Sequence, residues 1–140
     1  MKREYPDRPI VGVGAVIVEE GRALIVRRAQ EPQKGRWSIP GGAVELGETL
    51  RQAAAREALE ETGLAVEASE VLEVFDSIYH DPAGLTQYHY VLVDFLCRKT
   101  GGELRAASDV SDVRWVTPEE LAGFDIAPSA QRVIRKALET

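Results

Sequence analysis

Runs of apolar residues along the first part of the chain predict strands. Residues 11–19, VGVGAVIVE, are rich in β-branched side chains and are typical of a buried strand. Glu20 and Gly21 form a tight-turn signal, and residues 23–28 predict the returning strand. Arg27 and Arg28 end this strand and point to its opposite faces, because successive strand residues alternate. We therefore expect a hairpin at this end of the chain.

The second half of the chain contains the clearest alternation. Residues 88–98, YHYVLVDFLCR, predict a strand with Tyr88, Tyr90 and Leu92 on one face and His89, Val91, Val93 and Phe95 on the other. Residues 66–79 predict one or two short strands before it, and residues 81–84, DPAG, a turn between the two runs. Residues 113–116 predict a further strand.

Three segments predict helical structure. In residues 49–62, Leu50, Ala54 and Ala58 fall at i, i+4 and i+8 and form one apolar stripe. Gly63 follows the last turn, where a left-handed cap residue belongs. Residues 117–118, Thr-Pro, are a helix-start signal. Residues 127–138 predict an amphipathic helix with Val133, Ile134 and Leu138 facing inward. Strands around a central helix, with a helix at the end, indicate a mixed α/β sandwich.

Composition and charge exclude several classes of function. The 140 residues suffice for one domain, residues 1–140, with a single core. A net charge of −6 argues against non-specific binding to nucleic acid, and no apolar run is long enough to span a membrane. The first ten residues lack a secretory cleavage pattern, and the lone Cys97 fits a reducing compartment. We expect a cytoplasmic protein without nucleic-acid or membrane partners.

Carboxylates gather on one face of the helix predicted over residues 49–62. Glu57, Glu60 and Glu61 sit at i, i+3 and i+4 and repel one another unless a cation neutralises them. A cluster of oxygen ligands without Cys or His suits Mg²⁺, with Mn²⁺ as the alternative. Arg56 and Glu48 lie two turns apart and are placed to form a hydrogen-bonded pair. Any single Glu of this kind is usually only a solvated residue, but the conjunction of positions favours a site.

The segment from Gly41 to Leu64, GGAVELGETLRQAAAREALEETGL, resembles the Nudix box. That motif reads G-x5-E-x7-R-E-U-x-E-E-x-G-U, where U is a bulky apolar residue, and Ala58 is the one soft departure from it. The preceding residues 37–42, WSIPGG, resemble the short strand that delivers the box to the active site in this family.

The resemblance implies a fold, a reaction and roles for the residues of the box. The fold is an α/β/α sandwich with a central mixed sheet, and the reaction is hydrolysis of a nucleoside diphosphate linked to another moiety. The metal ligands implied are Glu57, Glu60, Glu61 and the carbonyl group of Gly42. Arg56 and Glu48 are implied to orient those carboxylates. Family members are often dimers, so a homodimer is one expected state.

Candidate residues outside the box are fewer and less specific. Asp109, in a loop that the resemblance places near the metals, is the candidate general base, and Asp112 is its competitor. The candidates for contact with the substrate are Arg27, Arg28, Trp37 and His80. The arginines and Trp37 have ordinary alternatives, which are a solvated strand end and core packing. His80, expected in the loop before Pro82, is there free to touch a substrate.

The flanks of the box favour one substrate over two alternatives. Residues 88–104 and 112–121 resemble a subgroup assigned to ADP-ribose pyrophosphatase activity, which gives AMP and ribose 5-phosphate. A proline often quoted for that activity has His80 in its place, with Pro82 two residues later. The alternatives are a nucleoside triphosphate pyrophosphatase, including one for oxidised nucleotides, and a non-catalytic domain that binds ADP-ribose.

Overall fold

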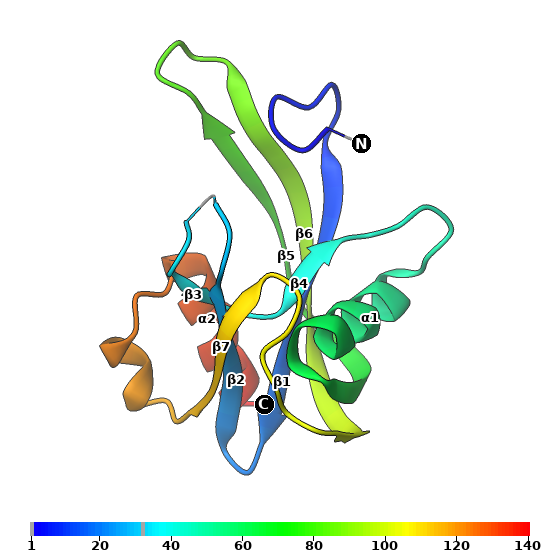
Figure 1. Ribbon diagram of the computed structural model, residues 1–140, viewed down its shortest axis with the longest axis vertical. Helices are drawn as coiled ribbons and strands as arrows, with labels where there is room; N and C mark the ends of the chain where they lie inside the picture. The colour runs from blue at the N-terminus through cyan, green and yellow to red at the C-terminus, as the bar shows by residue number, and fades with distance from the viewer. Residues whose placement is uncertain (1, 32) are drawn as a thin grey trace.

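The strand β1 (Ile10–Glu19) is the centre of a seven-stranded sheet in the computed structural model, which describes residues 2–31 and 33–140 (Figure 1). It pairs antiparallel with β2 and β4 and parallel with β6, so the sheet is mixed. The main strand order is β3-β2-β1-β6-β5, while β4 pairs with β1 and β7 with β2. The other elements are β2 (Arg22–Arg28), β3 (Trp37–Ser38), β4 (Gly41–Ala43), α1 (Leu50–Thr62), β5 (Leu64–His80), β6 (Thr86–Gly102), β7 (Val110–Val116), the 3₁₀ helix η1 (Glu120–Gly123) and α2 (Pro128–Leu138).

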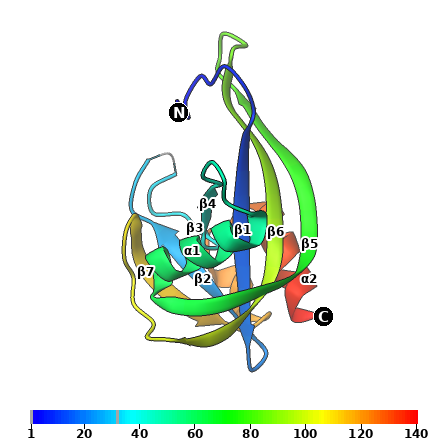
Figure 2. The ribbon, with the colours of Figure 1, turned by 90° about the vertical axis from the view of Figure 1, so that its right-hand side faces the viewer.

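One helix covers each face of the sheet (Figure 2). On one face, α1 packs through small alanines against β1 and β6, and Phe95 and Ile17 are fully buried there. On the opposite face, α2 packs through Val133 and Ile134 against Val16. The predicted α/β/α sandwich with a central mixed sheet is thereby confirmed.

The helix α1 begins and ends where the sequence predicts. Thr49 is its N-cap and forms a reciprocal capping box with Gln52, and Gly63 adopts the left-handed conformation at φ 76°. A side chain at position 63 would meet the carbonyl oxygen of Glu103, so glycine is also required by packing. The predicted apolar stripe is wrong at Leu50, which is 37% exposed, because the buried stripe is made by Ala53, Ala54 and Ala58.

The strands β5 and β6 form one long hairpin that projects from the body of the molecule (Figure 1). Each strand has 17 residues, so the expectation of one or two short strands over residues 66–79 is corrected to a single long strand. Register shifts near Ala68 and Val71 interrupt the alternation in β5, which explains why the sequence reads as broken there. Tyr5 of the N-terminal arm donates a hydrogen bond to Asp81 at the hairpin tip, at 2.7 Å.

The segment after β7 and the buried face of α2 also differ from the sequence predictions. Thr117 does not begin an α-helix: its hydroxyl and backbone exchange hydrogen bonds with Glu120, and only the short η1 follows. In α2, Ala137 is buried in addition to Val133 and Ile134, while Leu138 is only partly buried. Among the described residues, no helix is long and apolar enough to cross a membrane.

Candidate active site

Arg56 is the centre of an ion-pair network on α1. Its Nε donates to Oε2 of Glu48 at 2.6 Å, and its Nη2 donates to Oε1 of the same residue at 2.9 Å. Nη1 donates to Oε1 of Glu57 at 2.9 Å and lies 3.3 Å from Oε2 of Glu60, while Nη2 also reaches the carbonyl oxygen of Ala43. Hydrogen bonds from Arg56 lower the pKa of Glu48. The carboxylates of Glu48 and Glu57 in turn raise the pKa of Arg56. The expected pairing of Arg56 with Glu48 is therefore present.

Glu61 is a nearly buried carboxyl group, with 5% of its surface exposed. Its Oε2 accepts a hydrogen bond from the backbone N–H of Gly41 at 3.0 Å. Burial, followed by hydrogen-bond contact with Glu57, raises the pKa of Glu61 to about 9, and Asp109 adds a smaller contribution of the same sign. Two carboxyl groups thus share one site and compete for one proton.

Gly42 lies directly against Glu57. A Cβ atom at position 42 would sit 2.4 Å from Oε1 of Glu57, so only glycine leaves room for this carboxylate. Gly42 is held there by the pairing of β4 with Val13 of β1. The two glycines before the box therefore have separate tasks: Gly41 donates its N–H to Glu61, and Gly42 makes space for Glu57.

The donor set at this position fits a hard divalent cation. Glu57 and Glu61 present carboxylate oxygens without Cys or His, and their mutual repulsion is relieved only by a proton or by a cation. Glu60 differs from them: its side chain is half exposed and turned toward Arg56. In the part of the chain that the structure describes, no three such side chains are grouped as a metal site. Binding of Mg²⁺ by Glu57, Glu60, Glu61 and Gly42 stays a prediction.

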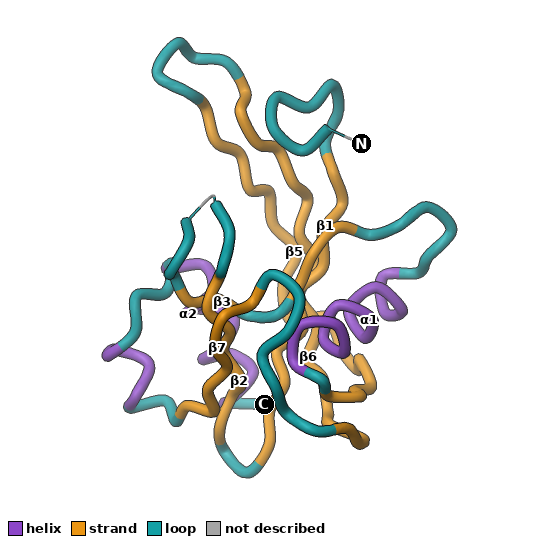
Figure 3. The backbone as a smooth tube through the Cα atoms, viewed as in Figure 1, coloured by secondary structure: helices purple, strands orange, loops and turns teal. Residues whose placement is uncertain are grey.

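A cleft of about 700 Å³ is lined by Gly42 and Asp109, by residues of the long hairpin and by residues of the loop that follows β2. Figure 3 shows the course of the backbone in that hairpin and that loop. Its walls combine aromatic and basic residues with one buried acid. The lining includes Arg28, Arg36, Trp37, Gly42, Phe75, Tyr79, His80, Tyr88, Tyr90, Leu92, Asp94 and Asp109. This cleft is large enough for a nucleotide-sized ligand.

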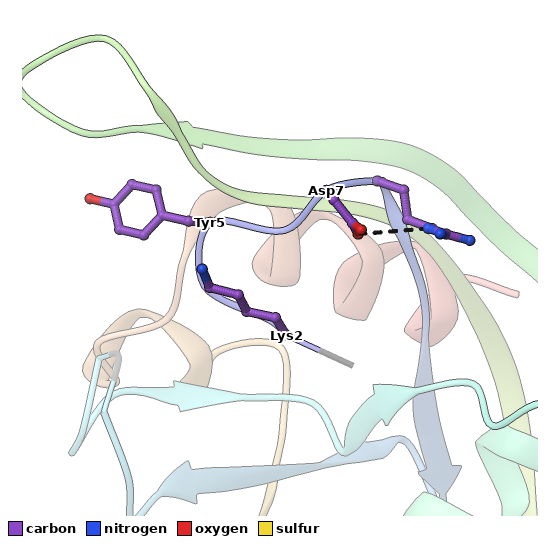
Figure 4. Close-up of a pocket in the computed structure, with 4 residues that line it drawn as sticks. Lys2, Tyr5 and Asp7 are labelled. Carbon is purple, nitrogen blue, oxygen red and sulfur yellow. Dashed lines mark ion pairs between the residues drawn. The ribbon is translucent and has the colours of Figure 1, made fainter.

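A second hollow, beside the N-terminal arm, has no comparable chemistry. It is lined by Lys2, Tyr5, Asp7 and Arg8, which all come from one short segment (Figure 4). Asp7 and Arg8 form only an exposed ion pair at 3.7 Å. The candidate active site is therefore the cleft beside α1.

The sequence model of the NUDIX domain family matches residues 8–137 of the chain. The chain belongs to the Nudix family. An ADP-ribose pyrophosphatase from Methanocaldococcus jannaschii is 36% identical over 76% of the chain, and the match spans only 61% of that relative. A putative 8-oxo-dGTP diphosphatase 2 from Mycobacterium tuberculosis is 40% identical over 84% of the chain and 79% of its own length. The crystal structure of a MutT NUDIX hydrolase from Burkholderia pseudomallei superposes with a TM-score of 0.77 at 28% identity, covering 93% of this chain and 98% of that one.

The Nudix fold brings together only some of the side chains expected to contact a substrate. Arg28, Trp37 and His80 line the cleft. Trp37 is half buried and also packs edge-to-face on Phe124, with ring centroids 5.2 Å apart. Its core-packing role is therefore present, while its contact with a substrate stays a prediction. Arg27 does not line the cleft: its Nε donates to the hydroxyl of Ser111 at 2.9 Å, and its guanidinium lies 5.8 Å from the Trp37 ring.

The two candidate general bases have different surroundings in this Nudix domain. Asp109 lines the cleft, and its negative charge contributes to the raised pKa of Glu61. Asp112 is part of β7, where its backbone pairs with that of Arg27 in β2. Its carboxylate accepts a hydrogen bond from the N–H of Val113 at 2.8 Å and lies 3.6 Å from Arg114. The geometry favours Asp109 over Asp112.

Apart from His80, sequence reasoning assigned no functional role to the cleft residues of the long hairpin. Tyr88, Tyr90 and Leu92 were predicted to share one face of β6, and all three line the cleft. Asp94 is the next residue on that face of β6, and unlike the other three it has an ionisable carboxyl group. Continuing the alternation by two residues would have identified it. Phe75 and Arg36 had no signal of this kind, because each needs the fold to bring it to the cleft.

Proposed function

We propose that this Nudix domain hydrolyses the phosphoanhydride of ADP-ribose, releasing AMP and ribose 5-phosphate, with Mg²⁺ as the cofactor and Mn²⁺ as an alternative. The observation that carries the proposal is the contact of the Glu57–Glu61 carboxyl pair with Gly41 and Gly42, which line a cleft of about 700 Å³ with aromatic walls. A pyrophosphate needs a site that neutralises its charge, and a nucleoside needs apolar surfaces for stacking. The similarity to an ADP-ribose pyrophosphatase supports this substrate.

The residues of the chain prepare the site for an anionic substrate. Glu57, Glu60, Glu61 and the Gly42 carbonyl group would hold the divalent cation, which when bound neutralises phosphate charge and acidifies a water molecule. Arg56 fixes the carboxylate of Glu57, and the N–H of Gly41 fixes that of Glu61. These contacts set the directions of the carboxylate oxygens before any ligand arrives.

Asp109 is the general base in this proposal. Its carboxylate accepts a proton from the attacking water as the water oxygen bonds to one phosphorus atom. The bridging P–O bond breaks, and the second phosphate leaves with the bonding electrons. The chain has a net charge of −6, which is unfavourable for binding an anion. Arg28 and Arg36 line the same cleft and add positive charge there.

Hydrolysis of nucleoside triphosphates is the second candidate. The observation that favours it is the 40% identity to a putative 8-oxo-dGTP diphosphatase 2, which extends over 79% of that relative. The same carboxyl pair serves this reaction, because the bond that is broken is again a phosphoanhydride. The products differ: a nucleoside monophosphate and pyrophosphate are formed.

A substrate panel with product identification decides between the two reactions. Purified protein with Mg²⁺ is given ADP-ribose, 8-oxo-dGTP and dGTP in parallel, and the products are separated by chromatography. We expect AMP and ribose 5-phosphate from ADP-ribose with the highest kcat/KM. Glu61→Gln in the same panel tests the carboxyl pair, and Glu45→Gln is its matched control, since the side chain of Glu45 is 69% exposed. Release of pyrophosphate from the triphosphates, with ADP-ribose untouched, would contradict the proposal.

A further inference from the structure

Asp94 is a buried acid in the cleft that the proposed reaction does not use. It lies on β6, on the cleft-facing side with Tyr90 and Leu92, and only 4% of its surface is exposed. Within residues 2–31 and 33–140, no group donates a hydrogen bond to its carboxylate. A buried carboxylate without a donor is costly, so a ligand that supplies one would be bound favourably.

Asp94 is packed against the backbone of β1 and is one of the residues that line the cleft. A Cβ atom on Gly14 would sit 2.3 Å from Oδ1 of Asp94, so glycine at this position makes room for the acid. The charged groups that face it are Glu73 from β5 and Arg132 from α2. Arg132 is already engaged by Glu73, with 2.9 Å between Nε and Oε1, and forms no hydrogen bond with Asp94. Burial raises the pKa of Asp94 to about 6, which leaves it mostly ionised at neutral pH.

The sheet fixes the backbone distance between Asp94 and Gly41, the residue that binds Glu61. Asp94 is the register partner of Gly14, and Gly14 is the partner of Gly41, whose N–H binds Glu61. Asp94 therefore lies two strand spacings, about 10 Å, from Gly41. This separation is comparable with the length of a nucleoside whose phosphate is held beside Glu61. Phe75 and Tyr90 line the cleft near Asp94 and offer surfaces for a flat ring.

We propose that Asp94 determines specificity by accepting a hydrogen bond from the exocyclic amino group of a nucleobase bound in the cleft. The inference rests on the proposed function insofar as the substrate is a nucleotide. An ionised carboxylate can only accept hydrogen bonds. Hypoxanthine in place of adenine would face it with a carbonyl oxygen, and hypoxanthine in place of guanine would offer a C–H where the amino group was. Sites built around such a bond reject analogues that lack the donor far more strongly than apolar pockets do.

The test compares substrates whose bases differ at the position of the amino group. The pairs are ADP-ribose with its hypoxanthine analogue, and dGTP with dITP; kcat/KM is measured for the wild type and for Asp94→Asn. We expect the wild type to prefer the amino-bearing member of the pair that it hydrolyses by roughly ten-fold or more. Asp94→Asn, whose amide both donates and accepts, should lower that preference at least several-fold. Which pair shows the effect identifies adenine or guanine as the source of the amino group.

The control variant is Asp76→Asn. Asp76 is an exposed acid of β5, and its register partner is Val91, so it faces away from the cleft. This variant should leave the preference unchanged. If Asp94→Asn does not fold, as judged by thermal melting, the wild type alone still tests the inference: equal kcat/KM for both members of a pair would overturn it.

Binding of product-like nucleotides separates this inference from the proposed reaction. Calorimetry without metal measures the affinities of AMP, GMP and IMP for the wild type and for Asp94→Asn. The role of Asp94 would be supported if the wild type binds AMP or GMP more tightly than IMP and Asp94→Asn does not. This result would count even if no substrate is hydrolysed. Hydrolysis of ADP-ribose with an unchanged preference in Asp94→Asn would overturn the inference and leave the proposed function intact. Failure of the wild type to bind any of the three nucleotides would also overturn it.

Discussion

Arg56 and Glu48, eight residues apart in sequence, form a two-pronged ion pair with distances of 2.6 and 2.9 Å. The pair ties the loop before α1 to the helix, and the same guanidinium holds Glu57 at 2.9 Å. Because the fork of an arginine matches a carboxylate in two directions, it fixes orientation as well as distance. The position of Glu57 beside Gly42 therefore depends on a residue that need not touch the substrate.

Replacement of Arg56 should lower turnover with little change of KM. Arg56→Ala removes the contacts to Glu48 and Glu57, and we expect a loss of roughly 10- to 100-fold in kcat. Arg56→Lys should recover little of it, because an ammonium group cannot form the two-pronged pair. Steady-state kinetics on the substrate identified by the panel would measure both effects. Wild-type kcat in Arg56→Ala would show that the network only stabilises the fold.

The stability of the metal-free protein should depend on pH through Glu61. Its pKa is raised from about 4.5 to about 9 in the folded state, so the folded state holds this proton more tightly than the unfolded state does. The stabilisation is fully present below pH 4.5 and is lost as the pH rises through 9. Thermal melts in EDTA should therefore show a decline of Tm over this range that Glu61→Gln reduces.

Mg²⁺ should oppose that decline. A cation that binds the ionised carboxyl pair stabilises the folded state by mass action, and it does so more strongly at high pH, where fewer protons compete. The gain in Tm on adding Mg²⁺ should thus be larger at pH 9 than at pH 6 and should be small in Glu61→Gln. A decline of Tm that is identical in the wild type and in Glu61→Gln would exclude Glu61 as its cause.

Asp109→Asn should reduce kcat more than Asp112→Asn does. Asp109 lines the cleft and acts on Glu61 electrostatically, whereas Asp112 is occupied by the N–H of Val113 and by Arg114. The amide in Asp109→Asn cannot accept a proton, so the loss should fall in the range of roughly 100- to 10,000-fold that general bases contribute. Pre-steady-state and steady-state rates of the two variants provide the comparison, and the reverse order would show that Asp112 is the base.

The box helix could be predicted from the sequence because its determinants are local. Its length, the cap at Gly63 and the pairing of Arg56 with Glu48 all follow from spacings within one segment. The exposure of Leu50 could not be predicted in this way, because it depends on which part of α1 reaches the sheet. The same holds for Glu60: spacing places it beside Glu57 and Glu61, while the structure turns it toward Arg56.

The cleft could be predicted only in part because its residues come from distant segments. Alternation along β6 correctly grouped Tyr88, Tyr90 and Leu92, but the register that sets Asp94 over Gly14 is a property of the folded sheet. Asp112 follows Asp109 and Ser111 and reads as a loop residue, yet its backbone pairs with that of Arg27 and places it in β7. Non-local pairing of this kind leaves no periodic mark in the sequence.

The central claim is that the Glu57–Glu61 carboxyl pair assembles the site at which a phosphoanhydride is hydrolysed. The most direct measurement is the kcat of Glu61→Gln at saturating Mg²⁺, with its fold checked by thermal melting. We predict a loss larger than the roughly 100-fold that removal of a supporting partner causes. A folded Glu61→Gln variant that turns over at the wild-type rate would contradict the account.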